Sequence, residues 1–383
     1  MKPLQMPMFS PETEWIPPTH LPDLKDHKEI AIDLETRDPG LKSSGSGSVN
    51  GNGEVVGIAV AVEGWSGYFP IAHEGGGNMD RALVLDWFEE VLHTDATKIF
   101  HNAMYDVSWI RSMGFYIRGG VIDTLIAASL IDENRWGYAL NALGKQYVGV
   151  GKNEKILNDA AKSWGIDPKA DMWRLPAPLV GEYAEQDAVL TLRLWHALQR
   201  EISSQDLWDV FNLETNLFPC LIDMKFKGVR VDAEKANLLK QELIKEEKNI
   251  YRGIRKLIGF DVEIWAAASI AKAFDEVKLP YDRTEKGAPS FTKNFLATHP
   301  HELPKAIANA REINKAHTTF IDTIIKHEHN GRIHADINQI RSDDGGTVTG
   351  RFSYSNPNLQ QIPARNKDLG PKIRALFIPE KNH

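Results

Sequence analysis

The stretch EIAIDLET, residues 29–36, determines the fold expected for the first half of the chain. Its apolar residues alternate and its last positions carry carboxylates, which is typical of a strand that brings polar groups to the edge of a sheet. Further strands are expected at 55–62, 67–73 and 98–102. Amphipathic helices are expected at 81–92, 103–113, 121–131 and 179–204. A strand meander followed by helices and a further strand predicts an α/β domain that ends near residue 204.

Three segments of distinct composition divide the rest of the chain. Residues 1–24 are rich in proline and polar residues and predict an N-terminal arm. The stretch LKSSGSGSVNGNGE (41–54) is rich in Gly, Ser and Asn and predicts a flexible loop. From residue 205 the apolar spacing becomes helical and stays so to about residue 328, with irregular or strand structure beyond it. The sequence therefore predicts a second, mainly helical region.

Length and composition limit the class of protein. A chain of 383 residues is too long for one ordinary domain. It has no apolar window of membrane-spanning length and no apolar signal-peptide core, and its one cysteine, Cys220, excludes an internal disulfide. Residues 1–204 hold 18 basic and 28 acidic residues, whereas residues 205–383 hold 27 and 24. An acidic first half suits divalent cations, and a mildly basic second half suits phosphate.

Two carboxylate-bearing pairs in the first half have spacings that bring their side chains together. Asp33 and Glu35 lie two apart on a strand, so both point to one face of the sheet. Asn102 and Asp106 lie four apart where a helix follows a strand; Asn is a favoured helix cap, and Asp106 has apolar neighbours that imply partial burial. Each pair alone is more often a solvated strand end or an ordinary cap than a metal site.

A third pair, Tyr183 and Asp187, lies four apart on one face of the last expected helix. Taken alone, these residues would be a half-buried tyrosine and a surface charge. The three pairs together, in this order, resemble the DEDD exonucleases of the tyrosine subclass. The histidine subclass would place His at the position of Glu182. The resemblance implies a ribonuclease H-like fold with Asp33, Glu35, Asp106 and Asp187 as metal ligands, and it makes Asp123 a structural helix cap.

The chemistry of such a set depends on its cations. Four carboxylates could hold two Mg²⁺ or Mn²⁺ ions, which would activate a water and stabilise the leaving 3′ oxygen. Tyr183 would orient the attacking water through its hydroxyl, since a phenol is too weak an acid to be an obvious base. We therefore expect hydrolysis of 3′-terminal nucleotides.

The second half resembles part of the family A (polymerase I-like) DNA polymerases. The segments that carry the resemblance are 213–232, TEKGAPSF (284–291), GTVTGRFSYSNPNLQQIPARN (346–366) and IRALFIP (373–379). The resemblance implies that Arg351 contacts the primer-terminal base pair from the minor groove, where all correct pairs share acceptors. It implies that Asn358 and Gln360 line the template-primer path, and that Thr349 can bond phosphate or sugar. Without the flanking match, Arg351 would be read as a surface salt bridge and the Asn/Pro run as a turn.

The combined prediction is an α/β, ribonuclease H-like exonuclease domain at 25–204, a helical thumb region at 205–330 and the start of a polymerase palm at 331–383, after the arm at 1–24. The family's palm carboxylates and fingers would follow His383, so this chain alone is not expected to polymerise. We expect a proofreading enzyme of phage type in the cytoplasm, acting on primer-template DNA and single-stranded 3′ ends, with no membrane partner.

Three alternatives stay open from the sequence. The first is a free-standing DEDD exonuclease that acts on RNA, which would have no reason to carry 346–379. The second is a DNA-clamping subunit whose carboxylates are vestigial. The third concerns partners: a second polypeptide could carry the palm and fingers.

Overall fold

The protein was analysed as a computed structural model that describes residues 11–343, 345–364 and 366–380. The chain forms two compact units. The first joins the chain up to Lys227 with Ala335–Asn358, and the second joins Gly228–His334 with the chain from Leu359 onward. The chain passes between the units after Lys227, His334 and Asn358, whereas the expected domain bounds lie at 204 and 330. The predicted arm at 1–24 lies outside the described residues over 1–10.

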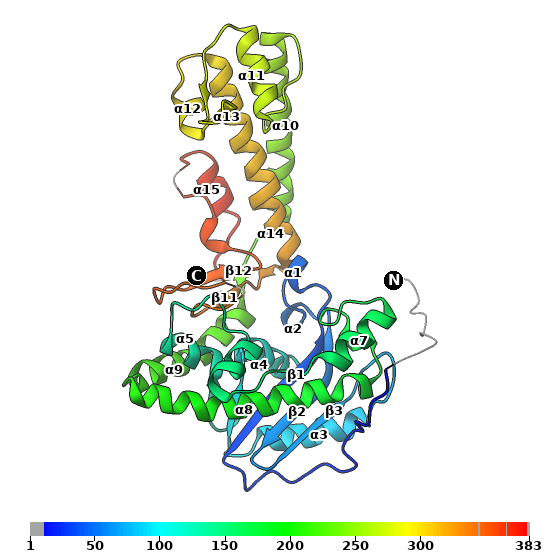
Figure 1. Ribbon diagram of the computed structural model, residues 1–383. Coiled ribbons are helices and arrows are strands. Elements are labelled where there is room, and N and C mark those ends of the chain that lie inside the picture. Colours follow the sequence, from blue (N-terminus) through cyan, green and yellow to red (C-terminus); the bar gives the residue numbers. More distant parts are fainter. Residues whose placement is uncertain (1–10, 344, 365, 381–383) are drawn as a thin grey trace. The chain divides into compact units, whose positions relative to one another are not determined.

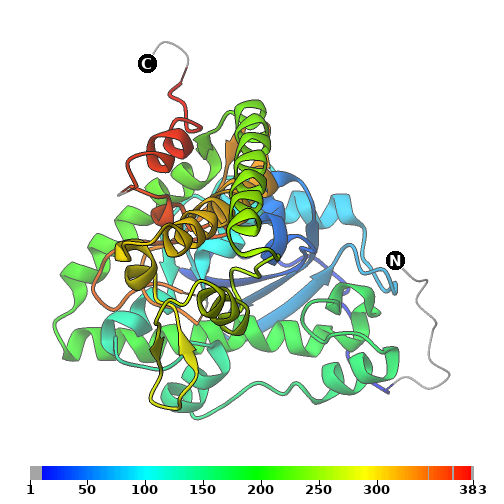
Figure 2. The ribbon, with the colours of Figure 1, turned by 90° about the horizontal axis from the view of Figure 1, so that it is seen from above.

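A five-stranded mixed sheet forms the centre of the first unit, in the order β3-β2-β1-β4-β5 (Figures 1 and 2). Its strands are β1 (Glu29–Arg37), β2 (Glu54–Val62), β3 (Trp65–Pro70), β4 (Thr97–Phe100) and β5 (Val121–Asp123). The first three strands pair antiparallel, whereas β4 runs parallel to β1 and β5 parallel to β4. The meander expected from the sequence is confirmed. The expected helix at 121–131 is wrong at its start, because 121–123 pair with β4 before α5 (Thr124–Ile131) begins.

Alternation along β1 divides the core between the two faces of the sheet. Ile30, Ile32 and Leu34 lie in one buried cluster with apolar residues of α3 (Arg81–Leu92) and α4 (Ala103–Ser112). Ala31 lies in a second buried cluster, with residues of α8 (Gly181–Ser204). By the same alternation, Asp33 and Glu35 share the face of Ala31.

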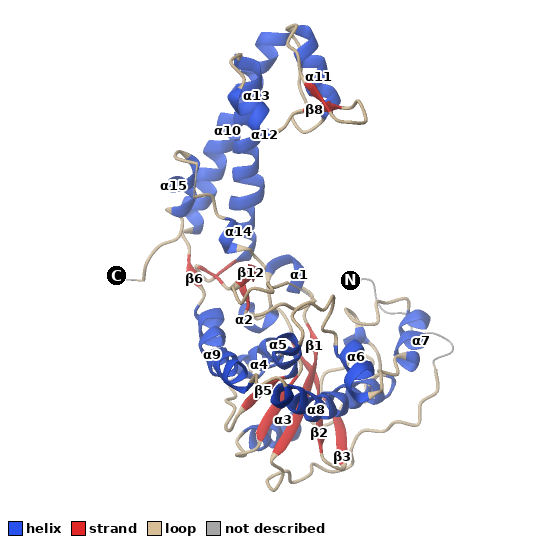
Figure 3. Ribbon diagram, turned by 60° about the vertical axis from the view of Figure 1, so that its left-hand side comes forward, coloured by secondary structure: helices blue, strands red, loops and turns tan. Residues whose placement is uncertain are grey.

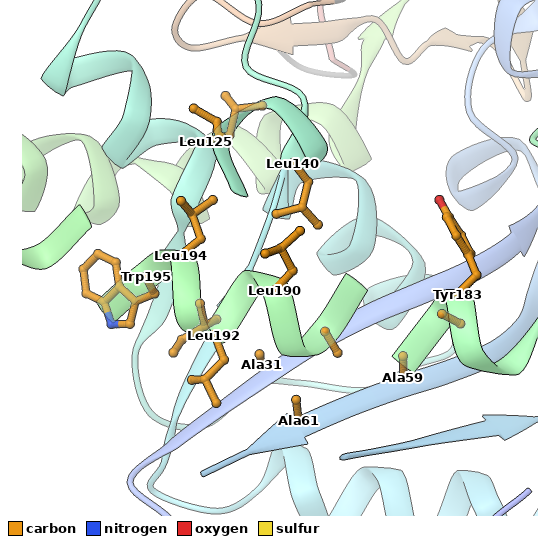
Figure 4. Close-up of a cluster of buried hydrophobic side chains, with 14 of the residues drawn as sticks. Ala31, Ala59, Ala61, Leu125, Leu140, Tyr183, Leu190, Leu192, Leu194 and Trp195 are labelled. Atoms are coloured by element: carbon orange, nitrogen blue, oxygen red, sulfur yellow. The ribbon is translucent and has the colours of Figure 1, made fainter. Parts of the chain in front are cut away.

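The long helix α8 crosses that second face of the sheet. Figure 4 shows Ala31, Ala59 and Ala61 of the strands beneath Leu190, Leu192 and Leu194 of the helix. Alanine side chains are small, so the helix backbone can lie close to the strands. Leu192 lies on the side of the helix that faces them, whereas Leu190 and Leu194 extend from the other side toward Leu140 and Leu125 (Figure 4). This packing sets the helix position from which Tyr183 and Asp187 reach the strand that carries Asp33 and Glu35.

Two stretches of the first unit differ from their sequence-based expectation. The predicted flexible loop at 41–54 contains two short helices, α1 (Leu41–Ser44) and α2 (Gly47–Asn50). The Asp38 carboxylate accepts the backbone N–H of Gly47 at 3.1 and 3.2 Å, which supplies a fixed partner that composition alone does not reveal. The stretch between α5 and α8 has no long periodic pattern, and it holds α6 (Leu140–Leu143), the π-helical η1 (Gly144–Val148), α7 (Lys155–Trp164), η2 (Met172–Arg174) and η3 (Ala177–Leu179).

A hairpin from the far end of the chain completes the first unit. Strands β11 (Asp336–Asn338) and β12 (Ser353–Ser355) pair antiparallel, and β11 contacts α9 (Trp208–Lys227). Lys225 on α9 is 3% exposed and its Nζ lies 2.9 Å from Asp336 Oδ1. Ser129 on α5 donates to the backbone carbonyl of Arg341 at 2.9 Å. The hairpin is therefore tied to the helices that surround the sheet.

The second unit is mainly helical, as the sequence predicts. Its long helices α10 (Ala233–Ile258) and α13 (Glu302–Lys315) lie side by side (Figure 3). The other elements are β6 (Val229–Arg230), α11 (Ala267–Glu276), β7 (Asp282–Arg283), β8 (Pro289–Ser290), α12 (Lys293–Thr298), η4 (Ala316–Ile321), α14 (Asp322–His327), β9 (Glu328–His329), β10 (Arg332–Ile333), η5 (Leu359–Gln361) and α15 (Leu369–Arg374). Among the described residues of both units, no helix has the length and apolarity needed to span a membrane.

Candidate active site

Three of the predicted metal ligands converge between β1 and α8. One carboxylate oxygen from each of Asp33, Glu35 and Asp187 lies within 4.8 Å of the others. The two-residue repeat of the strand sets the first two side chains on the face that α8 covers, and the helix places Asp187 above them. Residues 154 positions apart in the chain therefore form one acidic cluster.

The fourth predicted ligand, Asp106, lies beside this cluster on α4. It is 4% exposed, and its Oδ1 accepts the backbone N–H of Leu34 at 3.0 Å. Leu34 lies between Asp33 and Glu35 in β1, so this bond fixes Asp106 next to the strand. Burial raises the pKa of Asp106 well above its usual range, and the charge of Asp33 raises it further.

A lysine that the sequence analysis did not single out lies in the cluster. Lys152 Nζ donates to Asp187 Oδ2 at 2.5 Å and to the Tyr183 hydroxyl at 3.3 Å. The same nitrogen lies 5.0 Å from the centre of the Tyr183 ring, a cation–π distance. Lys152 comes between η1 and α7, in a stretch without periodicity, so no sequence signal marked it.

The carboxylates repel one another at this spacing. Burial raises the pKa of Asp33 to about 7, with a further rise from Asp187 and a partly opposing effect of Lys152. Burial and the charges of Asp33 and Asp187 raise the pKa of Glu35 well above its usual range. The pKa of Asp187 is raised by burial, although Lys152 lowers it in part. More positive charge is needed before all three can be ionised at neutral pH.

Asp123 organises the turn that leads into α4, where Asn102 takes the cap position that the sequence indicates but does not cap the helix through its side chain. Asn102 stands at the cap position with φ of +70°, but its side chain makes no capping hydrogen bond. Instead, the carboxylate of Asp123 accepts the backbone N–H groups of Asn102 at 2.9 Å and Ala103 at 2.8 Å. It also accepts Leu125 N–H at 2.8 Å and so caps α5, which confirms its predicted role as a cap.

A cavity of about 500 Å³ opens onto the acidic cluster. Its lining includes Asp33 and Asp187 from the cluster, Asn102 from the β4–α4 turn, and Asp336 and Asn338 from the β11–β12 hairpin. His101 also lines it, and its Nε2–H donates to the Tyr138 carbonyl at 3.0 Å, while its Nδ1 lies 2.8 Å from Thr124 Oγ1. Burial, and then the charge of Lys152, lower the pKa of His101 to about 4, so its imidazole is neutral at pH 7.

The other predicted DNA-binding residues are not part of this cavity lining. Thr349, Arg351, Asn358 and Gln360 are all exposed, and none lies in the described cavity lining. Thr347 donates to the Arg351 carbonyl at 2.7 Å and accepts from the Thr349 hydroxyl at 3.3 Å, which tightens the loop that carries Arg351. The structure therefore brings Asn102 to the carboxylates and leaves the other four residues on the surface.

Comparison with known proteins gives one family match in the first half of the chain and another in the second half. Residues 19–203 match the family described as 3'-5' exonuclease, and residues 233–383 match DNA polymerase family A. The two matches together span most of the chain, so its two halves are similar to 3'-5' exonuclease domains and to family A DNA polymerases. This confirms the expected α/β, ribonuclease H-like exonuclease domain followed by a helical polymerase region.

Individual relatives are longer than this chain. A "DNA-directed DNA polymerase" of Pseudomonas phage M6 is 35% identical over 99% of this chain and 60% of its own length. A "DNA polymerase I" of Pseudomonas aeruginosa is 28% identical over 95% of this chain and 39% of its own length. The solved "POL domain of Pol1 from M. smegmatis complex with DNA primer-template and dNTP" shares the fold with a TM-score of 0.69 at 19% identity, covering 92% of this chain and 55% of that one.

Proposed function

We propose that the first unit is a metal-dependent 3'-5' exonuclease that removes terminal nucleotides from DNA during proofreading. The observation that carries the proposal is the cluster of Asp33, Glu35 and Asp187, whose carboxylate oxygens lie within 4.8 Å of one another. The cluster lies in the segment that matches exonuclease domains. Asp187 is buried and the other two are half-buried, and like charges at this spacing favour a bound divalent cation.

The donor set fits hard cations. Carboxylate oxygens are the ligands that Mg²⁺ and Mn²⁺ prefer. Asp187 Oδ1 is buried and has no hydrogen-bond partner among the described residues, so a polar atom is available for a ligand. We assign two ions to Asp33, Glu35, Asp187 and Asp106; when bound, they would supply an activated water and stabilise the leaving oxygen.

The chain's own groups perform the remaining tasks. The cavity at the cluster is of the size of small-ligand sites and can take a terminal nucleotide. Burial and the charges of Asp187 and Glu35 raise the pKa of Tyr183, so its phenol stays protonated and orients a water by a hydrogen bond rather than acting as a base. Asn102 lines the same cavity and offers an amide to the sugar or base.

DNA is the proposed substrate because of the second half of the chain. Residues 233–383 match family A DNA polymerases, and the structural neighbour from M. smegmatis is described as a complex with DNA primer-template. We propose that Thr349, Arg351, Asn358 and Gln360 contact primer-template DNA. The chain spans 60% of the length of the phage M6 relative. We therefore propose polymerisation only for a longer protein of which this chain is a part, or for an assembly in which a second polypeptide carries the palm.

A 5′-labelled DNA oligonucleotide tests the proposal. With Mg²⁺ we expect stepwise shortening from the 3′ end, abolished by EDTA. The double variant Asp33→Ala with Glu35→Ala should lose at least about 100-fold in rate. The matched control removes two exposed carboxylates of α3, Asp86→Ala with Glu90→Ala, and should keep the wild-type rate.

Two results would contradict parts of the proposal. Full activity of the Asp33 and Glu35 variant would refute the site, and faster shortening of a matched RNA oligonucleotide would refute the substrate. DNA binding without shortening in either Mg²⁺ or Mn²⁺ would favour the non-catalytic clamping subunit.

A further inference from the structure

Lys152 places a buried positive charge at the carboxylate that both the metal site and Tyr183 depend on. Its side chain is 12% exposed and that of Asp187 is 5% exposed, and their closest atoms lie 2.5 Å apart. A charge-assisted bond of this length is strong when water is largely excluded. The lysine therefore belongs to the acidic cluster rather than to the solvated surface.

The charge of Lys152 acts on the cluster as a whole. It lowers the pKa of Asp33, Glu35 and Asp187 against the stronger effect of burial. Burial would lower the pKa of Lys152 itself, but the neighbouring carboxylates more than offset this and raise it. The lysine is thus a fixed counter-ion that the chain supplies to its own carboxylates.

The hydrogen bonds of Lys152 also set the direction of two neighbouring groups. Its bond to Asp187 uses Oδ2, which leaves Oδ1 as the oxygen without a partner among the described residues. Its bond to Tyr183 makes the phenolic oxygen an acceptor, so the phenol's own proton is left for another acceptor, Asp187 or a water. Both effects suit a carboxylate that offers one oxygen to a cation and a phenol that orients a water.

We propose that Lys152 is a positioning residue and built-in counter-ion of the exonuclease site. It aligns Asp187 and Tyr183 for the reaction, and it weakens divalent-metal binding because its charge and the metal share Asp187. The proposal rests on the proposed exonuclease function. It predicts two effects of opposite sign when the charge is removed: tighter metal binding and slower turnover.

Lys152→Met tests both signs, since it keeps the length of the side chain and removes the charge. Titration with Mn²⁺, monitored through the electron paramagnetic resonance signal of the free ion, should show about tenfold tighter binding in the variant. Single-nucleotide turnover at saturating Mn²⁺ should fall about tenfold, with KM for the oligonucleotide changed less than about threefold, because alignment rather than substrate binding is lost. A merely structural role would weaken metal binding and turnover together.

Two further variants show whether the effect comes from the local charge of Lys152, from its shape, or from the net charge of the protein. Lys152→Arg keeps the charge and should bind Mn²⁺ within about twofold of wild type, with turnover partly restored. Exposed Lys155→Met changes the net charge equally, three residues away, and should leave both measurements unchanged. If the methionine variant does not fold, Lys152→Gln takes its place with the same two signs expected.

The outcomes distinguish this inference from the function on which it rests. If the wild type binds Mn²⁺ and shortens DNA, but Lys152→Met binds Mn²⁺ equally or more weakly, the role of Lys152 is refuted and the exonuclease proposal stands. A wild type that neither binds Mn²⁺ nor shortens DNA refutes both.

Discussion

Replacing Asp123 by alanine should loosen the turn that delivers Asp106 to the acidic cluster. The Asp123 carboxylate is 6% exposed and accepts three backbone N–H groups, those of Asn102, Ala103 and Leu125, at 2.8–2.9 Å. Each buried N–H left without an acceptor costs about 1–3 kcal/mol. Because water can enter the space that the carboxylate leaves, we expect the low end of the sum, a loss of about 3–5 kcal/mol in the free energy of unfolding.

Asp123→Asn gives a graded test of the same argument. Its single acceptor oxygen can serve Asn102 and Leu125, as Oδ1 does in the wild type, while its amide group faces the N–H of Ala103. One N–H is then unsatisfied rather than three, so the expected loss is about 1–3 kcal/mol. Urea denaturation followed by circular dichroism measures both variants, and the exonuclease rate should fall in the same order.

A matched control is Asp132→Ala at the end of α5. Among the residues that the structure describes, its carboxylate accepts one hydrogen bond, from the exposed N–H of Asn134, so the expected change is below about 1 kcal/mol. A free energy of unfolding of Asp123→Ala within about 1 kcal/mol of the wild type would refute the structural role of Asp123. An asparagine variant no more stable than the alanine variant would refute it as well.

Three further predictions follow from the site and the hairpin. Asp33 has a pKa raised from 3.8 to about 7, so the metal-free folded state binds more protons than the unfolded state. The melting temperature in EDTA should therefore fall by several degrees as the pH rises from 4 to 7. Saturating Mg²⁺ should remove that fall, and Asp33→Asn should reduce it, because Glu35, Asp106 and Asp187 also have raised pKa values. Lys225→Met leaves Asp336 without its buried partner and should lower stability by about 3 kcal/mol in urea denaturation, whereas an unchanged midpoint would mean that the pair contributes nothing. Tyr183→Phe should slow nucleotide release about 10- to 100-fold at unchanged KM, and a full rate would exclude the phenol from orienting the water.

The sequence predicts the acidic cluster well because each pair of residues is local. A two-residue spacing on a strand and a four-residue spacing on a helix determine which side chains share a face, independently of tertiary contacts. Asp33 with Glu35, and Tyr183 with Asp187, needed only the correct secondary structure and the packing of α8 on the sheet. Local reasoning was incomplete at Asn102. Helix-cap preference correctly placed Asn102 at the start of α4, but the carboxylate of Asp123, 21 residues away, accepts the backbone N–H groups there.

Features that depend on distant partners could not be predicted. Lys152 lies in a stretch without periodicity, and its role depends on its contact with Asp187, 35 residues away. Within 41–54, the bond between Asp38 and Gly47 holds the start of α2, and composition does not reveal such a partner. The contact of α9 with the β11–β12 hairpin pairs segments more than 100 residues apart, which no local pattern encodes.

The discontinuous make-up of the first unit affects the order in which the protein can fold as it is synthesised. The 107 residues from Gly228 to His334 separate α9 from the hairpin that packs on it. At about 5–20 residues per second, residue 358 leaves the ribosome's catalytic centre roughly 7–26 s after Lys227. During that interval Asp336 is not yet there for Lys225 to contact, so α9 lacks the hairpin that packs on it while the whole intervening unit is made and free to fold.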